Sequence, residues 1–140
     1  MGYNYNIFDQ ILAINAGGMS SQSTRLKIIS ENMANANSTS LSPSIEPYRR
    51  KRVFFGDVWD EQTGVKKVAV RKISPDMGPL PMEYNPSHPG ADENGNIKKT
   101  NVEALIEMMD MQNASISYKA NLEAYVASND LYLKTINLLT

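Results

Sequence analysis

Several residue types are scarce in this 140-residue chain, and each scarcity excludes a class of function. There is no cysteine, so disulfides, thiolate zinc ligands and cysteine nucleophiles are excluded. One histidine cannot supply the usual nitrogen ligands of a zinc site, and 14 basic residues against 15 acidic ones create no bulk field that attracts nucleic acid. The length indicates about one domain. We therefore expect a protein without metal or cofactor.

Long apolar runs are missing as well. No window of about 18 apolar residues occurs, which excludes a membrane-spanning helix. The residues from Met1 to Asn6 include no basic side chain, and the weak apolar run from Ile11 to Ala16 is interrupted by Asn15, so no secretory signal is recognised. If the chain leaves the cytosol, we expect another route to carry it.

Proline divides the chain into three segments. All seven prolines lie between Pro43 and Pro89. Because a proline inside a helix costs about 3 kcal/mol, long helices can form before and after this stretch but not within it. The sequence predicts an N-terminal helix in residues 1–37, a β and loop insertion in residues 38–100, and a C-terminal helix in residues 101–140.

Apolar residues of the N-terminal segment recur at alternating steps of four and three. This spacing is typical of a helix that packs along its length against another helix. Gly17 and Gly18 interrupt the pattern and predict a kink or a close approach by a neighbouring chain. The helix is expected to end by Asn37. The predicted seam positions are Phe8, Leu12, Met19, Leu26, Ile29 and Met33.

The C-terminal segment carries the same repeat. Thr100 and Glu103 have the spacing of a capping box and predict the start of a helix. From there to the end of the chain a helix would be about 60 Å long, more than a domain of this size can cover by itself. The seam positions on this helix are Met108, Met111, Tyr118, Leu122, Tyr125, Tyr132, Ile136 and Leu139.

The middle segment is predicted to form two strands followed by a loop. Residues 48–55 are rich in strand-forming types and end at Gly56, and residues 65–73 alternate between apolar and polar. Residues 74–95 hold five prolines and three glycines and predict an extended loop. The expected fold is mainly α: two long terminal helices paired as an antiparallel coiled coil, with a small β-hairpin and loop insertion between them.

Candidate chemistry is sparse. His88 could act as a general base with Asp92 and Ser87 nearby, but a histidine between two prolines usually serves turn packing. The stretch Asp92–Asn96 resembles part of a calcium loop, yet glycine and asparagine stand where its first and last acidic ligands belong, which favours a simple turn. The cluster of Met108, Met109 and Met111 fits an adaptable recognition surface, although helical spacing favours the seam.

The run Arg49–Arg52 is the strongest local charge. A phosphate site is one interpretation, and contact with an acidic protein surface or plain solvation is the favoured one. The valine and phenylalanines that follow indicate a strand whose arginines alternate between its two faces. No phosphate-binding glycine loop occurs.

One run of residues resembles a known family. Residues Arg25–Asn37 are similar to the signature of bacterial flagellar axial proteins of the rod and hook. Further stretches narrow the resemblance to a short rod protein and extend it over most of the chain: Pro47–Phe54, Tyr84–Asp92, Asn101–Val102, Glu107–Met111 and Ser117–Asn121. Gly90 and Asn94 depart from the acidic turn expected in that family, which further weakens a metal interpretation.

The resemblance implies a non-enzymatic structural subunit of the proximal rod, the drive shaft that crosses the periplasm. It implies self-association within a helical tube, export through the flagellar type III apparatus without a cleaved signal, and torque transmission to the hook. The implied partners are the other proximal rod proteins, the adaptor between rod and membrane ring, and the distal rod protein. Expected partners do not include nucleic acid or a membrane.

Residues outside the seam are the expected contacts with neighbouring subunits. Because these faces lack cover in a single molecule, the free monomer is expected to have frayed termini that order on assembly. A cytosolic coiled-coil adaptor or export chaperone is the alternative function, and a small hydrolase using His88 is a third. The expected interface residues are Ile7, Ile11, Ile14, Ile28, Asn32, Asn35, Arg49, Arg50, Arg52, Leu105, Ile106, Val126 and Leu133.

Overall fold

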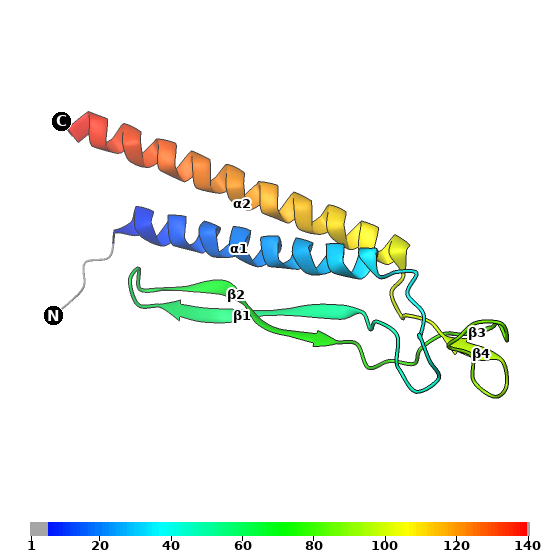
Figure 1. Ribbon diagram of the computed structural model, residues 1–140. Helices are drawn as coiled ribbons and strands as arrows, with labels where there is room; N and C mark the ends of the chain where they lie inside the picture. The colour runs from blue at the N-terminus through cyan, green and yellow to red at the C-terminus, as the bar shows by residue number, and fades with distance from the viewer. Residues whose placement is uncertain (1–5, 140) are drawn as a thin grey trace. The chain divides into compact units, whose positions relative to one another are not determined.

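The described part of the chain folds into two long helices and two small sheets. A computed structural model of the chain describes residues 6–139 (Figure 1). The long terminal helices and the β insertion match the prediction, with a larger share of strand than a mainly α fold implies. The elements in chain order are α1 (Ile7–Ala34), β1 (Lys51–Asp60), β2 (Val65–Pro75), β3 (Met82–Tyr84), β4 (Asn96–Lys98) and α2 (Ala104–Leu139).

The chain forms two compact units, and each one draws on all three predicted segments. Unit 1 combines the residues up to 26 with residues 54–72 and those from 112 on. Unit 2 combines residues 27–53 with residues 73–111. Both helices and the β1–β2 hairpin therefore contribute to each unit, and the two units are described separately below.

Asn6 begins α1 as an N-cap. Its side-chain Oδ1 accepts a hydrogen bond of 3.0 Å from the backbone N–H of Phe8, and its carbonyl accepts the first helical bond, from Gln10. This satisfies donors that have no partner within the helix. At the other end, turns joining Asn35 to Asn32 and Ala36 to Met33 finish the helix, which agrees with the predicted end by Asn37.

The start of α2 differs from the predicted capping box. The helix begins at Ala104, after Glu103, and the carbonyl of Glu103 accepts a bond from Glu107 N–H. The hydroxyl of Thr100 accepts a bond from Val102 N–H, two residues on, so it forms a local turn before the helix. Thr100 lies four residues before the first helical residue, too far upstream to cap the helix, and its own N–H donates to the carbonyl of Ser38.

The two helices run antiparallel. In unit 1 the rings of Phe8 and Tyr132 have centroids 5.2 Å apart, and Gly18 lies against Asn121. In unit 2 Asn32 bonds Glu107. The residue numbers of each pair add up to 139 or 140. The two pairs of unit 1 therefore show α1 and α2 in an antiparallel register, and the unit 2 pair is described with the polar cluster below.

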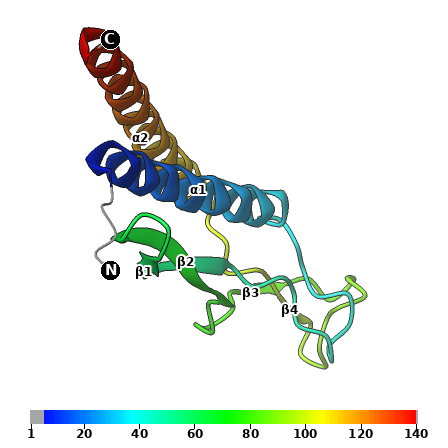
Figure 2. The same cartoon turned by 90° about the vertical axis from the view of Figure 1, so that its left-hand side faces the viewer.

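Close approaches in unit 1 explain the glycine pair. A Cβ on Gly17 would lie 3.0 Å from the carbonyl oxygen of Val68, and one on Gly18 would lie 2.4 Å from Oδ1 of Asn121. The approach predicted for a neighbouring chain is thus made by this chain's own hairpin and its own second helix. In this unit α1 lies between α2 and the hairpin (Figures 1 and 2).

The β1–β2 hairpin is longer than predicted. The first strand continues through Gly56 to Asp60, and the second ends at Pro75. At the turn Gly64 adopts a φ of 67°, which glycine reaches without steric cost, and its N–H bonds the carbonyl of Asp60. The predicted end at Gly56 was wrong: the strand continues through it, and the side chain of Arg71 on β2 packs over the glycine.

Part of the predicted loop of residues 74–95 is ordered in unit 2. Strands β3 and β4 pair antiparallel, with Glu83 opposite Ile97. Thr39, on the segment after α1, adds an antiparallel bridge to Lys99. The expectation of a purely irregular loop was wrong, because Met82–Tyr84 pair with Asn96–Lys98, which follow the last proline of the chain. None of the described helices is long and apolar enough to cross a membrane.

Candidate assembly surfaces and the buried polar cluster

A buried polar cluster in unit 2 joins α1, β1 and α2. Asn32 is 1% exposed and uses both ends of its amide. Its Nδ2 donates to the carbonyl of Lys51 at 2.9 Å and to Oε2 of Glu107 at 3.0 Å. Its Oδ1 accepts from the hydroxyl of Tyr48 at 2.8 Å and from Lys51 N–H at 2.9 Å. An amide with all of these bonds made holds three elements in one arrangement.

Glu107 is the acidic member of this polar cluster. It is 0% exposed, and its second oxygen, Oε1, accepts a bond of 2.5 Å from Nε of Arg50. Arg50 also reaches Asp110 through Nη2 at 3.0 Å. A buried carboxylate is tolerated only where it is paired and hydrogen-bonded, and Glu107 meets both conditions.

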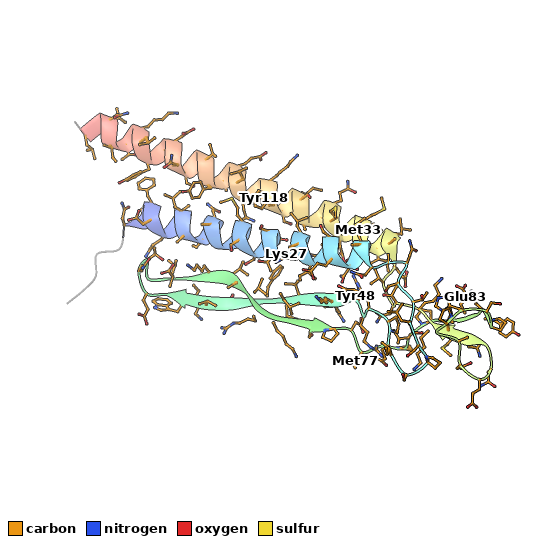
Figure 3. All side chains as sticks on the ribbon, in the orientation of Figure 1. Lys27, Met33, Tyr48, Met77, Glu83 and Tyr118 are labelled. Carbon is orange, nitrogen blue, oxygen red and sulfur yellow. The ribbon has the colours of Figure 1, made fainter. Side chains whose placement is uncertain are left out.

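Burial and pairing shift the pKa values of the groups around the cluster. Burial raises the pKa of the Tyr48 hydroxyl above its ordinary value, which keeps this donor to Asn32 protonated. The hydrogen bond from Lys51 lowers the pKa of Glu31, and the same contact raises the pKa of Lys51. Tyr48, labelled in Figure 3, lies on the segment that leads into β1.

The four cations of the run 49–52 all have acceptors within the chain. Arg49 bonds Glu46 and the carbonyls of Asp76 and Gly78, and Arg50 bonds Glu107 and Asp110. Lys51 bonds Glu31 at 2.9 Å. Arg52 lies 4.0 Å from Asp76 and has a side chain that is 55% exposed. The run contributes chiefly to the interior of unit 2, and Arg52 is its most exposed member.

His88 holds a loop in unit 2. Its Nδ1 accepts a bond of 3.0 Å from Gly90 N–H, and its Nε2 lies 3.3 Å from the hydroxyl of Thr39. Asp92 accepts the N–H groups of Asn94 and Asn96, which closes the turn. His88 and Asp92 therefore stabilise the conformation of this loop. Within residues 6–139 there is no cluster of acidic residues and histidine that could bind a metal.

Gly90 explains one departure from the resemblance. A Cβ at this position would lie 2.1 Å from the carbonyl oxygen of Ser40, so no larger residue fits without moving the segment after α1. The aspartate expected there would not fit this packing.

The predicted seam residues are divided between the helix interface and the surface. Ile29 is buried, and the other N-terminal seam residues are partly buried. On α2, Met111, Tyr118, Tyr125 and Tyr132 are partly buried, and Figure 3 shows Tyr118 between the two helices. The four remaining α2 positions are exposed: Met108, Leu122, Ile136 and Leu139.

The inward face of α2 includes positions that pattern reasoning missed. Glu107 and Ala114 are 0% exposed, and Asn121 and Ser128 follow at the same heptad position and are partly buried. These residues are charged, small or polar, so an apolar repeat does not reveal them. The sequence signal for this face is a repeat of seven residues, which these positions share with the neighbouring tyrosines Tyr118, Tyr125 and Tyr132.

The predicted interface residues also divide into two groups. Ile28 and Asn32 are buried inside unit 2, and Asn35 bonds the carbonyl of Glu31. These three, like Arg49 and Arg50, already have contacts within the subunit. The apolar members that lie on the surface are Ile7, Ile11, Ile14, Leu105, Ile106, Val126 and Leu133.

Exposed apolar side chains are frequent on both helices. Ile7 is 64% exposed, Leu105 is 71% exposed, and Leu138 is 87% exposed. Apolar surface of this extent marks contact with other molecules more often than free surface.

Comparison with known proteins identifies the family. Residues 12–40 match the family described as flagella basal body rod protein. The flagellar basal-body rod protein FlgC of Agrobacterium fabrum is 49% identical over 126 residues, covering 90% of this chain and 91% of that protein. The chain belongs to the FlgC family.

More distant FlgC proteins agree along nearly the same length. That of Salmonella typhimurium is 37% identical over 95% of this chain and 96% of its own length. The FlgC protein of Borreliella burgdorferi is 33% identical over 87% of this chain and 91% of its own length. As a member of the FlgC family, this chain is a structural subunit of the flagellar basal-body rod and is not an enzyme.

Proposed function

We propose that this chain is a subunit of the proximal rod, in which its two long helices pack with those of neighbouring subunits into a helical tube. The exposed apolar faces of α1 and α2 carry this proposal, because a single copy leaves them in contact with water. The contact residues we assign are those on the surface: Ile7, Ile11, Ile14, Leu105, Ile106, Val126 and Leu133.

Torque would then pass through many packed helix contacts rather than through one strong joint. Each antiparallel pair resists relative sliding because a shift of one residue removes every side chain from its partner. The buried polar cluster fixes the register within the subunit, so load applied to one helix is shared by the other. The proposed partners are the other proximal rod proteins, the adaptor to the membrane ring, and the distal rod protein.

The proposed location is the periplasmic section of the basal body, reached through the flagellar type III export apparatus. A chain without cysteine needs no disulfide formation in an oxidising compartment. Arg52 is available for a partner because its side chain is more than half exposed.

Imaging of basal bodies tests the proposal directly. Basal bodies isolated from cells that lack this chain should retain the inner membrane ring and lose everything distal to it. Complementation with the native chain should restore the rod, whereas Val126→Asp, on the exposed face, should not. Intact rods in the deletion strain would contradict the proposal and favour the cytosolic adaptor or chaperone.

Amide exchange of the purified monomer gives a second test. If the helix faces are completed only on assembly, residues near both ends of the chain should exchange rapidly in dilute solution. Strong protection throughout residues 8–36 and 105–138 in the free monomer would oppose assembly-dependent ordering.

A further inference from the structure

The turn Asp92–Asn96 in unit 2 contains the only asparagine of the sequence that is followed by glycine. Asn94 is exposed, and its backbone N–H donates to Oδ1 of Asp92 at 2.9 Å. Its side-chain amide has no hydrogen-bond partner among residues 6–139. Nothing in the described part of the chain therefore holds this amide away from the backbone nitrogen of the next residue.

The conformation of the turn requires glycine at position 95. Gly95 has a φ of 78°, which residues with a side chain rarely adopt. A Cβ at this position would lie 2.9 Å from Cε2 of Tyr84 and 3.1 Å from Cβ of Pro86. A residue without a Cβ also has the least hindered backbone nitrogen. The packing that selects glycine thus leaves an unhindered nitrogen next to an unbonded asparagine amide.

We propose that Asn94 is a site of spontaneous deamidation, at which asparagine is converted into aspartate and isoaspartate. Asparagine is among the thermolabile residue types. Hydroxide removes the proton from the Gly95 nitrogen, which then attacks Cγ of Asn94. A bond forms between these two atoms, the bond from Cγ to Nδ2 breaks, and Nδ2 takes up a proton and leaves as ammonia. The product is a five-membered cyclic imide.

Water then opens the imide in one of two ways. Cleavage of the bond between Cγ and the Gly95 nitrogen gives aspartate with the original main chain. Cleavage of the bond between the main-chain carbonyl carbon of residue 94 and the same nitrogen gives isoaspartate, whose main chain runs through the former side chain. Overall one water is consumed and one ammonia is released, and the reaction needs no oxidant or reductant.

One hydrogen bond must open before the attack. The N–H of Gly95 donates to the carbonyl of Asp92 at 2.9 Å, so the nitrogen is not free while the turn is closed. Glu93 and Asn94 are both exposed, and exposed turns open at a small cost in free energy without unfolding of the whole protein. We therefore expect the reaction to proceed in the folded chain through local opening of the turn.

A second turn of unit 2 provides a matched comparison. Asn37 is also exposed, and the N–H of the next residue, Ser38, donates to the carbonyl of Asn35 at 3.0 Å. Both asparagines thus precede a nitrogen that is bonded to the carbonyl three residues before it. They differ because Ser38 has a side chain that hinders its nitrogen and Gly95 does not. Asn37 should accordingly react more slowly than Asn94.

Isoaspartate should disturb the turn more than aspartate does. It adds one carbon to the main chain between residues 94 and 95. Two hydrogen bonds span this point: Asn96 N–H to Oδ1 of Asp92, and Asp92 N–H to the carbonyl of Asn96. Asn96 is also the first residue of β4 and pairs with Tyr84 of β3. The longer main chain therefore affects both the turn and the start of the strand pair.

Mass spectrometry of the aged native chain tests the proposal. The purified full chain is incubated at mildly alkaline pH for weeks, and circular dichroism confirms that it stays folded. The peptide that contains Asn94 should gain about 1 Da, several-fold faster than the peptide that contains Asn37. The gain should accelerate with pH because the attacking nitrogen must lose a proton. No gain at Asn94 in the folded chain, or equal rates at Asn94 and Asn37, would overturn the proposal.

Two variants at position 94 separate the steps. Asn94→Gln would require a six-membered ring, so it should lose most of the gain in mass, and an unchanged rate would contradict attack by Gly95. Asn94→Asp has the charge of the product on a normal main chain, so its amide exchange at residues 92–98 should match that of the native chain. The isoaspartate form should exchange faster there, and equal exchange would contradict the predicted disturbance. Because the reaction belongs to this chain alone, these tests hold whether or not the proposed rod function is correct.

Discussion

Asn32 on α1 donates a hydrogen bond of 3.0 Å to Glu107 on α2, at a point where neither residue is more than 1% exposed. Two polar groups in such a place are costly unless each finds its partner. A displacement of one helix along the other by a single residue would separate them and leave a carboxylate without its donors. The pair thereby selects one register among the several that apolar side chains alone would accept.

Replacing Glu107 should therefore destabilise unit 2 strongly. Glu107→Ala removes the acceptor of both Asn32 and Arg50 and should lower the free energy of unfolding by about 3–5 kcal/mol, the usual effect of breaking a buried pair from one side. The exposed neighbour Glu103 is the control, since Glu103→Ala should change the free energy of unfolding by no more than about 0.5 kcal/mol. Urea unfolding followed by circular dichroism measures both. Equal effects would show that the buried pair contributes little.

Gly18 should resist substitution in spite of its low helix propensity. Alanine would gain about 1 kcal/mol of propensity in an isolated helix, but its Cβ would lie 2.4 Å from Oδ1 of Asn121. We expect Gly18→Ala to destabilise unit 1 by a net amount of about 1–2 kcal/mol, as overpacked sites do.

A double variant isolates the cause of that effect. Asn121→Ala removes the obstructing side chain, so Gly18→Ala combined with Asn121→Ala should be more stable than Gly18→Ala alone. Thermal midpoints of the native chain, both single variants and the double variant provide the comparison. An increase in midpoint for Gly18→Ala by itself would mean that the helices do not approach as closely as described.

Acid should loosen the tip of the β1–β2 hairpin. The hydrogen bond from Lys67, 2.6 Å long, lowers the pKa of Asp60 below its ordinary value. A depressed folded-state pKa means that this stabilisation is complete above the unfolded pKa of about 3.9 and is lost as the pH falls through the lower, folded value. Asp60→Asn should remove this acid-dependent part of stability, which unfolding midpoints between pH 6 and about pH 2 would detect. If the unfolding midpoints of the native chain and of Asp60→Asn fall in parallel as the pH is lowered, the Asp60–Lys67 bond does not contribute to the acid dependence.

His88→Ala should act locally. The substitution removes the acceptor of Gly90 N–H and the contact with Thr39, so amide exchange at residues 85–95 should accelerate while the helices keep their protection. Rod assembly and swimming should stay close to native. Loss of an enzymatic activity on this substitution would instead support the hydrolase alternative.

Much of the fold could be predicted from the sequence because its strongest signals are local. The confinement of proline to residues 43–89 separates the two helices from the insertion, and the run after Lys51 indicates a strand through its valines and aromatics. The two short strands of unit 2 gave no such signal. Tyr84 and Asn96 pair across a loop of prolines and glycines, and such a pairing depends on the loop closing rather than on the strand residues themselves.

The candidate site was harder to predict because burial and charge give opposite signals there. Glu107 appears in sequence as a solvent-facing residue, and the seam was accordingly assigned to Met108, which is 57% exposed. Arg50 similarly appeared as part of a surface patch. Only the meeting of Arg50, Asn32 and Glu107 in three dimensions makes burial of the carboxylate possible, and that meeting joins residues far apart in the chain.

The two helices differ in length, 28 residues in α1 and 36 in α2, and their register in unit 1 places most of the excess at the C-terminal end of α2. Tyr132 lies opposite Phe8, which is the second residue of α1, whereas α2 continues to Leu139. The last two turns of α2 therefore overhang the start of its partner, and Leu138 and Leu139 on them are 87% and 82% exposed. Among the described residues, trimming these turns would remove little of the interior of unit 1, so the two leucines offer apolar area for contact with another molecule.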